Sequence, residues 1–309
     1  MRRAAVLACL AAVALAGCGL GPGEERGGAG VELRVTRDFG HELLLARDGL
    51  RIREDETVMR LLKRNADVDT RFGGGFVQAI DRVSGGGATG TSDWFYYVNG
   101  IEADEGAADY ELSPGDVVQW DHRDWGQTMN LRAIVGAFPQ PFLDGLDGKR
   151  FPVRVECEDV DSVPCVRVKQ RLRNAGVPAN GASLGASGNQ RVARVVVAGW
   201  ERARQLPSAR LVELGPRRSG VFARFVDEGA ALGLLTEDGR VSRTERAGAG
   251  LVAALRPSED ELVWLVTGVD YAGVEAASEA FRARDLRNAF AIAAAVDRVV
   301  EKLPLRRER

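Results

Sequence analysis

The segment WFYYVNG at residues 94–100 holds the side chains of this sequence that are best suited to gripping a flat, apolar ligand. The 309-residue chain has 5 Trp, 4 Tyr and 11 Phe, and four of these aromatic residues stand side by side here. Aromatic rings bury a large area, and Trp and Tyr keep a polar tip that can reach a partner. Because side chains alternate along a strand, Trp94 and Tyr96 are predicted on one face and Phe95 and Tyr97 on the other.

A second segment, VVQWDHRDW at residues 117–125, adds Trp120 and, at its end, Trp125. Two interpretations of these rings stay open. In the first, the rings pack inside a small sheet or between two domains. In the second, Trp94, Tyr96, Trp120 and Trp125 form a platform that binds a planar ligand, because a large exposed apolar patch usually marks a binding site.

Two of the four cysteines, Cys157 and Cys165, lie well inside the chain. Such a pair predicts a disulfide when the protein is exported to an oxidising compartment. A metal site is the weaker alternative, since two thiols in a chain with only 2 histidines fall short of a zinc ligand set. We therefore predict the disulfide and no metal.

No catalytic arrangement stands out. GASLGASG offers no serine on a strand–helix elbow, and GPRRSG lacks the spacing and the lysine of a phosphate-binding loop. His41 and His122 have no obvious nucleophile partner. The dense run Asp121-His122-Arg123-Asp124 alternates between two strand faces, so it forms no single site. The sequence predicts a protein that is not an enzyme and has no certain cofactor.

The first 17 residues predict export. Two arginines precede an apolar run from Ala4 to Leu15, the layout of a secretory signal, and this run is shorter than the ~20 residues that span a bilayer. LAGC at residues 15–18 resembles the bacterial lipoprotein box. The resemblance implies cleavage before Cys18 and its acylation, for example with palmitate, which anchors a protein stably when two chains are attached. An ordinary secretory signal with a chance cysteine is the alternative.

Cleavage would leave 292 residues (309 − 17) and move the formal charge from −2 to −4 as two arginines leave. That length favours two domains. Neither sign of charge dominates, so nothing indicates nucleic acid binding. Residues 18–30 are rich in glycine and predict a flexible tether.

Residues 31–137 are predicted to form a β-grasp domain, in which one helix packs on a small mixed sheet. Val58, Leu61 and Leu62 share one face of the expected helix. The expected helix is 53–65, and the expected strands are 31–38, 41–48, 76–83, 94–100 and 117–125.

The motifs TVMRLLKR, GGFVQAID, WFYYVNG and GAADYELSPGDVVQWDHRDW resemble the transcobalamin-like C-terminal domain over residues 31–126. This β-grasp module occurs in bacterial surface proteins and in animal cobalamin carriers. The resemblance implies cobalamin or a related corrinoid as ligand, and a transporter for its uptake in the same envelope as partner. In animal carriers a larger helical domain completes the site, whereas here an α/β unit follows.

Residues 138–150 are predicted to be a linker, and residues 151–305 an α/β layered domain. The overall fold class is therefore α+β. Helices are expected at 162–176, with Val163, Val166 and Leu172 inward, and at 271–286, with Val274, Ala277, Ala280 and Phe281 inward. Strands are expected at 151–158, 191–200, 209–214, 220–226, 260–270, 290–295 and 297–303.

These features predict a lipid-anchored binding protein on the extracytoplasmic face of the cell membrane, which presents cobalamin or a related ligand to an uptake system. The alternative is a structural or adhesion lipoprotein that contacts cell-wall polymer or another envelope protein.

The anchor is tested by Cys18→Ala. Because the acyl chains hold the protein at the membrane, we expect the variant to appear in the medium or to remain as an uncleaved precursor. The measurement is detergent partitioning and intact mass of both proteins. Identical partitioning of wild type and variant would contradict the anchor.

Overall fold

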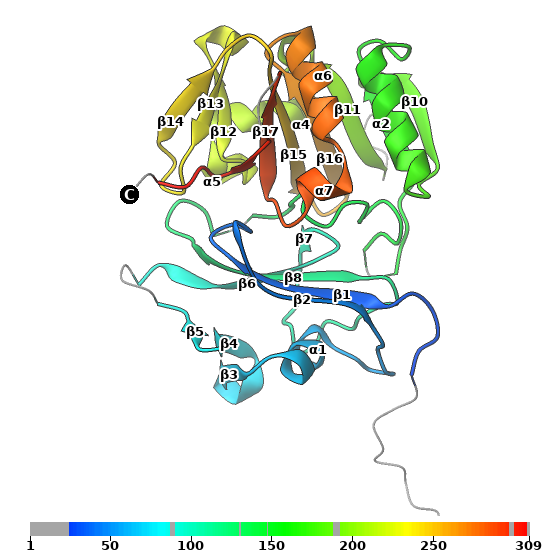
Figure 1. Cartoon of the computed structure of the whole chain (residues 1–309). Coiled ribbons are helices and arrows are strands. Elements are labelled where there is room, and N and C mark those ends of the chain that lie inside the picture. Colours follow the sequence, from blue (N-terminus) through cyan, green and yellow to red (C-terminus); the bar gives the residue numbers. More distant parts are fainter. Residues whose placement is uncertain are drawn as a thin grey trace, which may run out of the picture.

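The chain folds as two stacked α+β units, which confirms the predicted fold class (Figure 1). The structure is a computed structural model that describes residues 25–86, 90–129, 131–146, 148–187, 192–296 and 300–307. The predicted signal and Cys18 lie outside these ranges. No helix within them is long and apolar enough to cross a membrane.

The first domain is built on a five-stranded sheet in the order β2-β1-β8-β6-β7. Strands β1 and β8 are parallel and the other neighbours are antiparallel, so the sheet is mixed as predicted. Its strands are β1 (Val31–Arg37), β2 (Glu42–Leu50), β6 (Ser92–Val98), β7 (Ile101–Glu102) and β8 (Val117–Asp124). A small separate sheet contains β3 (Val68–Arg71), β4 (Phe76–Ile80) and β5 (Val83–Ser84).

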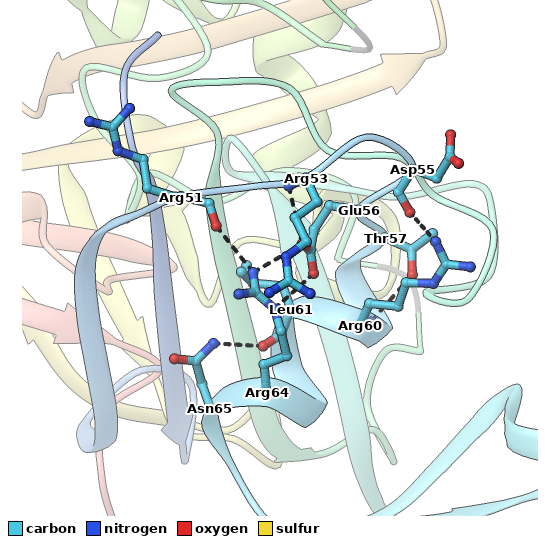
Figure 2. Close-up of polar contacts among 9 residues, drawn as sticks. All are labelled: Arg51, Arg53, Asp55, Glu56, Thr57, Arg60, Leu61, Arg64 and Asn65. Atoms are coloured by element: carbon cyan, nitrogen blue, oxygen red, sulfur yellow. Dashed lines mark hydrogen bonds and ion pairs between the residues drawn. The ribbon is translucent and has the colours of Figure 1, made fainter. Parts of the chain in front are cut away.

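Helix α1 (Val58–Asn65) covers one face of the five-stranded sheet. Thr57 caps its start by accepting a hydrogen bond from the Arg60 N–H at 3.3 Å. Figure 2 shows how Glu56, which is almost fully buried, is held by the Arg64 guanidinium at 3.0 Å and by the Arg53 N–H at 3.3 Å. These bonds fix the helix so that Val58, Leu61 and Leu62, all fully buried, face the sheet as predicted.

The second domain is built on a seven-stranded sheet in the order β10-β9-β11-β16-β15-β17-β18. The first four strands in this order are parallel and the rest pair antiparallel. The strands are β9 (Val153–Cys157), β10 (Ala179–Ser183), β11 (Ala193–Gly199), β15 (Ala249–Ser258), β16 (Glu261–Gly268), β17 (Ala291–Ala295) and β18 (Glu301–Leu303).

Two further layers cover this sheet. Helices α2 (Val163–Asn174) and α6 (Tyr271–Ala280) lie side by side on one face (Figure 1). The other face carries short helices and a three-stranded sheet, namely α3 (Trp200–Ala203), α4 (Pro207–Arg210), α5 (Pro216–Ser219), β12 (Ala223–Val226), β13 (Ala231–Leu235) and β14 (Val241–Glu245). The apolar strand β11 serves both layers: Val195 and Val197 face α2 and α6, whereas Val196 faces the other side.

Three local predictions were wrong. The strand expected at 76–83 is β4 (Phe76–Ile80), which pairs with β3 and β5 in the separate sheet and not in the five-stranded sheet. Residues 209–214 form the end of α4 and a 3₁₀ turn, not a strand. Pro207 starts this helix, and the buried residues Ala209 and Val212 stand three apart, which is a helical spacing. In α2, Val163 and Val166 are exposed, because the inward face is set by the buried Cys165, Val168 and Leu172. The inward residues predicted for α6 are confirmed.

The predicted linker packs into the second domain. Phe138 and Phe142 are buried, and their rings lie 4.9 Å from Phe281 and from Trp264, respectively, between centroids. In the predicted tether, Arg26 donates from its N–H to the Ile52 carbonyl at 2.9 Å, so this part lies along the first domain.

The turn between β1 and β2 joins the two domains. Phe39 packs edge-on against Phe222 and Phe290, at 5.1 and 5.4 Å between centroids. Gly40 has φ +75°, and a Cβ there would lie 1.7 Å from the Asn288 carbonyl oxygen, so only glycine fits. The Lys302 ammonium donates to the Gly40 carbonyl at 2.8 Å.

Asp121 of β8 holds this turn from inside the junction. Its fully buried carboxylate accepts hydrogen bonds from the Thr36 hydroxyl at 2.6 Å and from the N–H groups of Phe39 and Gly40 at 3.0 and 2.8 Å. Burial raises the pKa of Asp121 to about 7, although these donors and Arg123 favour the charged form.

The stability of the junction should therefore depend on pH. Because the folded protein holds the Asp121 proton more tightly than the unfolded chain, ionisation of Asp121 lowers stability as the pH rises from about 4 to about 7. Each pH unit in that window is worth at most about 1.4 kcal/mol. Asp121→Asn removes this dependence, because the amide does not titrate. The difference in the free energy of unfolding between the variant and wild type should therefore shift in favour of the variant as the pH rises through this window. Above the window, that difference should stay constant. Denaturant unfolding at several pH values measures this difference.

The exposed Asp69→Asn in β3 is the control for the loss of one carboxylate. If the difference between wild type and Asp121→Asn is the same from pH 4 to 7, Asp121 does not titrate as described.

Candidate functional site

The predicted platform residues lie mainly on the face of the first sheet that α1 covers. Trp94 and Trp120 are buried at 6% and 3% exposure, whereas Tyr96 and Trp125 are half-buried. Trp94 packs in a tilted contact against His122 at 5.2 Å, and Tyr96 does the same against Trp120 at 5.1 Å, between centroids. The Tyr96 hydroxyl donates to the Glu105 carbonyl at 2.5 Å. Trp94, Tyr96 and Trp120 thus form a ring row within the first domain.

The alternate residues of β6 face the second domain, as the alternation predicts. The Arg123 guanidinium lies 3.7 Å from the centroid of Phe95, a cation–π contact. Tyr97 is fully buried with its ring 5.5 Å from that of Phe290, and burial raises the pKa of its hydroxyl. The four adjacent aromatic residues of WFYYVNG therefore supply two different cores, one on each side of a single strand.

The second domain carries a cleft of about 400 Å³ at the carboxyl ends of its parallel strands. The walls come from segments that follow β9, β11 and β16 directly. The lining residues are Glu158, Asp159, Ser162, Pro164, Val197, Ala198, Gly199, Trp200, Glu201, Arg202, Val269, Asp270, Tyr271 and Val274. We call this the switch-point cleft.

The topology explains why a cleft opens here. The chain leaves β9 through α2, on one face of the sheet, and returns to the outer strand β10. It leaves β11, the neighbour of β9, through α3 on the opposite face. Where adjacent parallel strands send their connections to opposite faces, a crevice forms at their carboxyl ends, and ligands of open α/β sheets bind there.

Some polar side chains of the cleft already make hydrogen bonds within the protein. Asp270 caps α6 by accepting from the Gly273 N–H at 2.8 Å, and it also accepts from the Gly248 N–H at 3.0 Å. Glu158 accepts from the Gly199 N–H at 3.3 Å. Tyr271, which also lines the cleft, is 56% exposed and therefore accessible from solvent.

The disulfide between Cys157 and Cys165 confirms the predicted pairing. Cys157 is the last residue of β9 and Cys165 lies in the first turn of α2, so the bond closes the loop that carries Glu158 and Asp159. Closing a loop this short stabilises the folded state by about 2–3 kcal/mol, because the crosslink lowers the entropy of the unfolded chain. The disulfide therefore fixes one wall of the switch-point cleft.

The described residues contain no group of three or more His, Cys, Asp or Glu side chains that could hold a metal ion. Sequence reasoning missed the switch-point cleft because its walls are far apart in the chain. The available signal was the polar segment after each of three strands, of which GVD at residues 268–270 is the clearest.

Residues 55–123 match the family model described as "Domain of unknown function (DUF4430)". This match lies within the first domain and leaves the second domain uncovered. The sequence matches no curated protein. This chain is similar to a solved crystal structure, that of a proposed metal binding protein from Ruminococcus gnavus ATCC 29149, with 13% sequence identity and a TM-score of 0.24. The similarity covers 31% of this chain and 97% of that chain.

The ring row should behave as core. Trp94→Ala and Trp120→Ala remove large buried rings, so each should lower the free energy of unfolding by about 3–5 kcal/mol. Phe72→Ala is the matched control, because Phe72 is 87% exposed and its loss should change stability by no more than about 0.5 kcal/mol. Denaturation midpoints measure all three. Stability unchanged in both Trp variants would show that these rings are not core.

Proposed function

We propose that this chain is a lipid-anchored, extracytoplasmic protein that binds a small ligand in the switch-point cleft without transforming it. The observation that carries the proposal is the cleft itself: about 400 Å³, at the carboxyl ends of three parallel strands, with one wall fixed by a disulfide. Ligand pockets typically have this size and place in open α/β sheets.

The lining indicates what kind of ligand fits. Glu158, Asp159 and Glu201 are exposed carboxylates in the walls, and Arg202 is the cation among them. The Arg202 guanidinium lies 3.9 Å from the Glu158 carboxylate, close enough to orient it. A ligand that donates hydrogen bonds or carries a positive charge, such as an amine or an amino sugar, suits this excess of acceptors. The Tyr271 ring offers a face to its apolar part.

The disulfide also supports export, because such bonds persist in oxidising compartments. The first domain would then lie between the membrane anchor and the domain that carries the cleft. Arg26, near the predicted anchor, contacts Ile52 and Leu112 of the first domain, on the side of α1. The second domain packs on the opposite face of the sheet (Figure 1). This arrangement would hold the cleft-bearing domain away from the membrane.

Cobalamin and its transporter, which the resemblance of the first domain implies, would use the ring row instead. Trp94 and Trp120 would have to be uncovered for a corrinoid to stack on them, because both are buried. The half-buried Tyr96 and Trp125 are the rings of this set that a ligand could reach without unfolding the domain.

The test is calorimetric titration of the full, detergent-solubilised lipoprotein with amines, amino sugars and cobalamin. We expect a ligand of the first two classes to bind, and Tyr271→Ala or Arg202→Ala to weaken it about tenfold by removing one contact to the ligand. Both residues are largely exposed, so stability should change little.

Phe72→Ala and Arg173→Ala are the controls, since they remove an exposed ring and an exposed guanidinium outside the cleft. If cobalamin binds, and if the cleft variants bind it as tightly as wild type does, the function belongs to the first domain. Retention on wall polymer, with no small ligand bound, would favour the adhesion alternative.

A further inference from the structure

A second cavity, of about 320 Å³, is lined by four arginines. Arg132 comes from the segment after β8, Arg217 and Arg218 from α5, and Arg256 from β15. The remaining lining residues are Leu211, Ser219, Leu255 and Pro257. We call this the arginine cavity. It shares no residue with the switch-point cleft.

Arg256 is held rigidly. Its side chain is only 7% exposed, and its guanidinium donates to the Glu102 carbonyl and to the Asp104 carboxylate, both at 3.3 Å. These bonds tie β15 of the second domain to the end of β7 in the first. The position of Arg256 in the cavity lining is therefore fixed by the domain junction.

The other three arginines form no ion pair with any residue that the structure describes. Arginines nearby in the chain behave differently: Arg204 pairs with Glu213 at 2.6 Å, and Arg246 with Asp227 at 2.9 Å. Arg217 and Arg218 are exposed, so their guanidinium groups can turn toward the cavity at little cost. Three unpaired guanidiniums on one cavity repel one another unless an anion lies between them.

Acidic neighbours do not cancel this charge. Glu102 lies near Arg132 but also 4.0 Å from the buried Arg123, which therefore shares it. Burial raises the pKa of Glu102, against the effect of both arginines. Asp104 already forms an ion pair with Arg256. The cavity keeps an excess of positive charge.

We propose that the arginine cavity binds a small organic phosphate or diphosphate. Guanidinium forks match the geometry of phosphate oxygens and bind them by paired hydrogen bonds, so several arginines favour an anion with clustered charges. The apolar wall of Leu211, Leu255 and Pro257 suits the carbon part of an ester, which a free inorganic anion would leave unused. This site is independent of the function proposed for the switch-point cleft.

The test is calorimetric titration of the full lipoprotein with sodium pyrophosphate and with glycerol 3-phosphate, using glycerol as the uncharged probe. We expect both phosphates to bind, glycerol not to bind, and affinity to fall as salt rises. The double variant Arg217→Ala/Arg218→Ala should weaken binding about tenfold or more, since the loss of even one charged hydrogen bond to the ligand weakens binding by about that factor. Arg132→Ala should act in the same direction.

Arg224→Ala in β12 is the matched control, because Arg224 is exposed and lies outside the cavity lining. Without ligand, the double variant should unfold at the same denaturant concentration as wild type or a higher one, since like-charge repulsion is removed. If neither phosphate binds, the proposal is wrong. It is equally wrong if phosphate binding weakens as much in Arg224→Ala as in the double variant, because that result describes general surface charge.

Discussion

The buried carboxylate of Asp121 is the interaction on which the arrangement of the two domains depends. It accepts hydrogen bonds from the Thr36 hydroxyl and from the N–H groups of Phe39 and Gly40, and so holds a turn whose residue Phe39 sits in the core of the second domain. Phe39 has a φ of 58°, which a bulky residue seldom adopts. Because this turn is buried between the domains, the group that accepts hydrogen bonds from its N–H groups must be buried as well. A buried carboxylate with three donors meets that need at the cost of desolvation.

This constraint changes the chemistry of the first sheet. A sheet that faced water would place its polar residues outward and leave them solvated. Here the outward face is covered, so Gln119 and Arg123 are buried between domains and need partners. Gln119 donates to the Asn288 carbonyl at 3.3 Å, and Arg123 to the carbonyls of Thr128 and Met129 at 3.0 and 2.8 Å. The junction is a polar layer crossed by a few aromatic contacts, and its directional hydrogen bonds favour one defined orientation over a sliding apolar contact. Not every polar atom in it is paired: Gln119 Oε1 and Arg123 Nε are buried and make no hydrogen bond within the part of the chain that the structure describes.

The sequence predicted what depends on periodicity and on local pairs. Strand alternation assigned Trp94 and Phe95 to opposite faces, the helical spacing identified Leu61 and Leu62, and the lone cysteine pair formed its disulfide. Periodicity could not show that the polar face of the first sheet is covered, because Asp121 and Arg123 follow the same pattern whether they meet water or another domain. The switch-point cleft and the arginine cavity were missed for a related reason. Each is assembled from segments that only the tertiary fold brings together.

The two cavities lie at opposite ends of one pair of strands. Leu255, which lines the arginine cavity, pairs with Val263 near the start of β16, whereas Val269 of the switch-point cleft follows the end of the same strand. An eight-residue strand spans roughly 25 Å, so no small molecule can occupy both cavities. Their charges also differ, since carboxylates predominate in one and arginines in the other. The strand pair is buried along most of its length and packed on both faces, so it offers no hinge between them. Under the two proposals made above, ligands of opposite charge would occupy opposite ends of this strand pair, each selected by its own cavity.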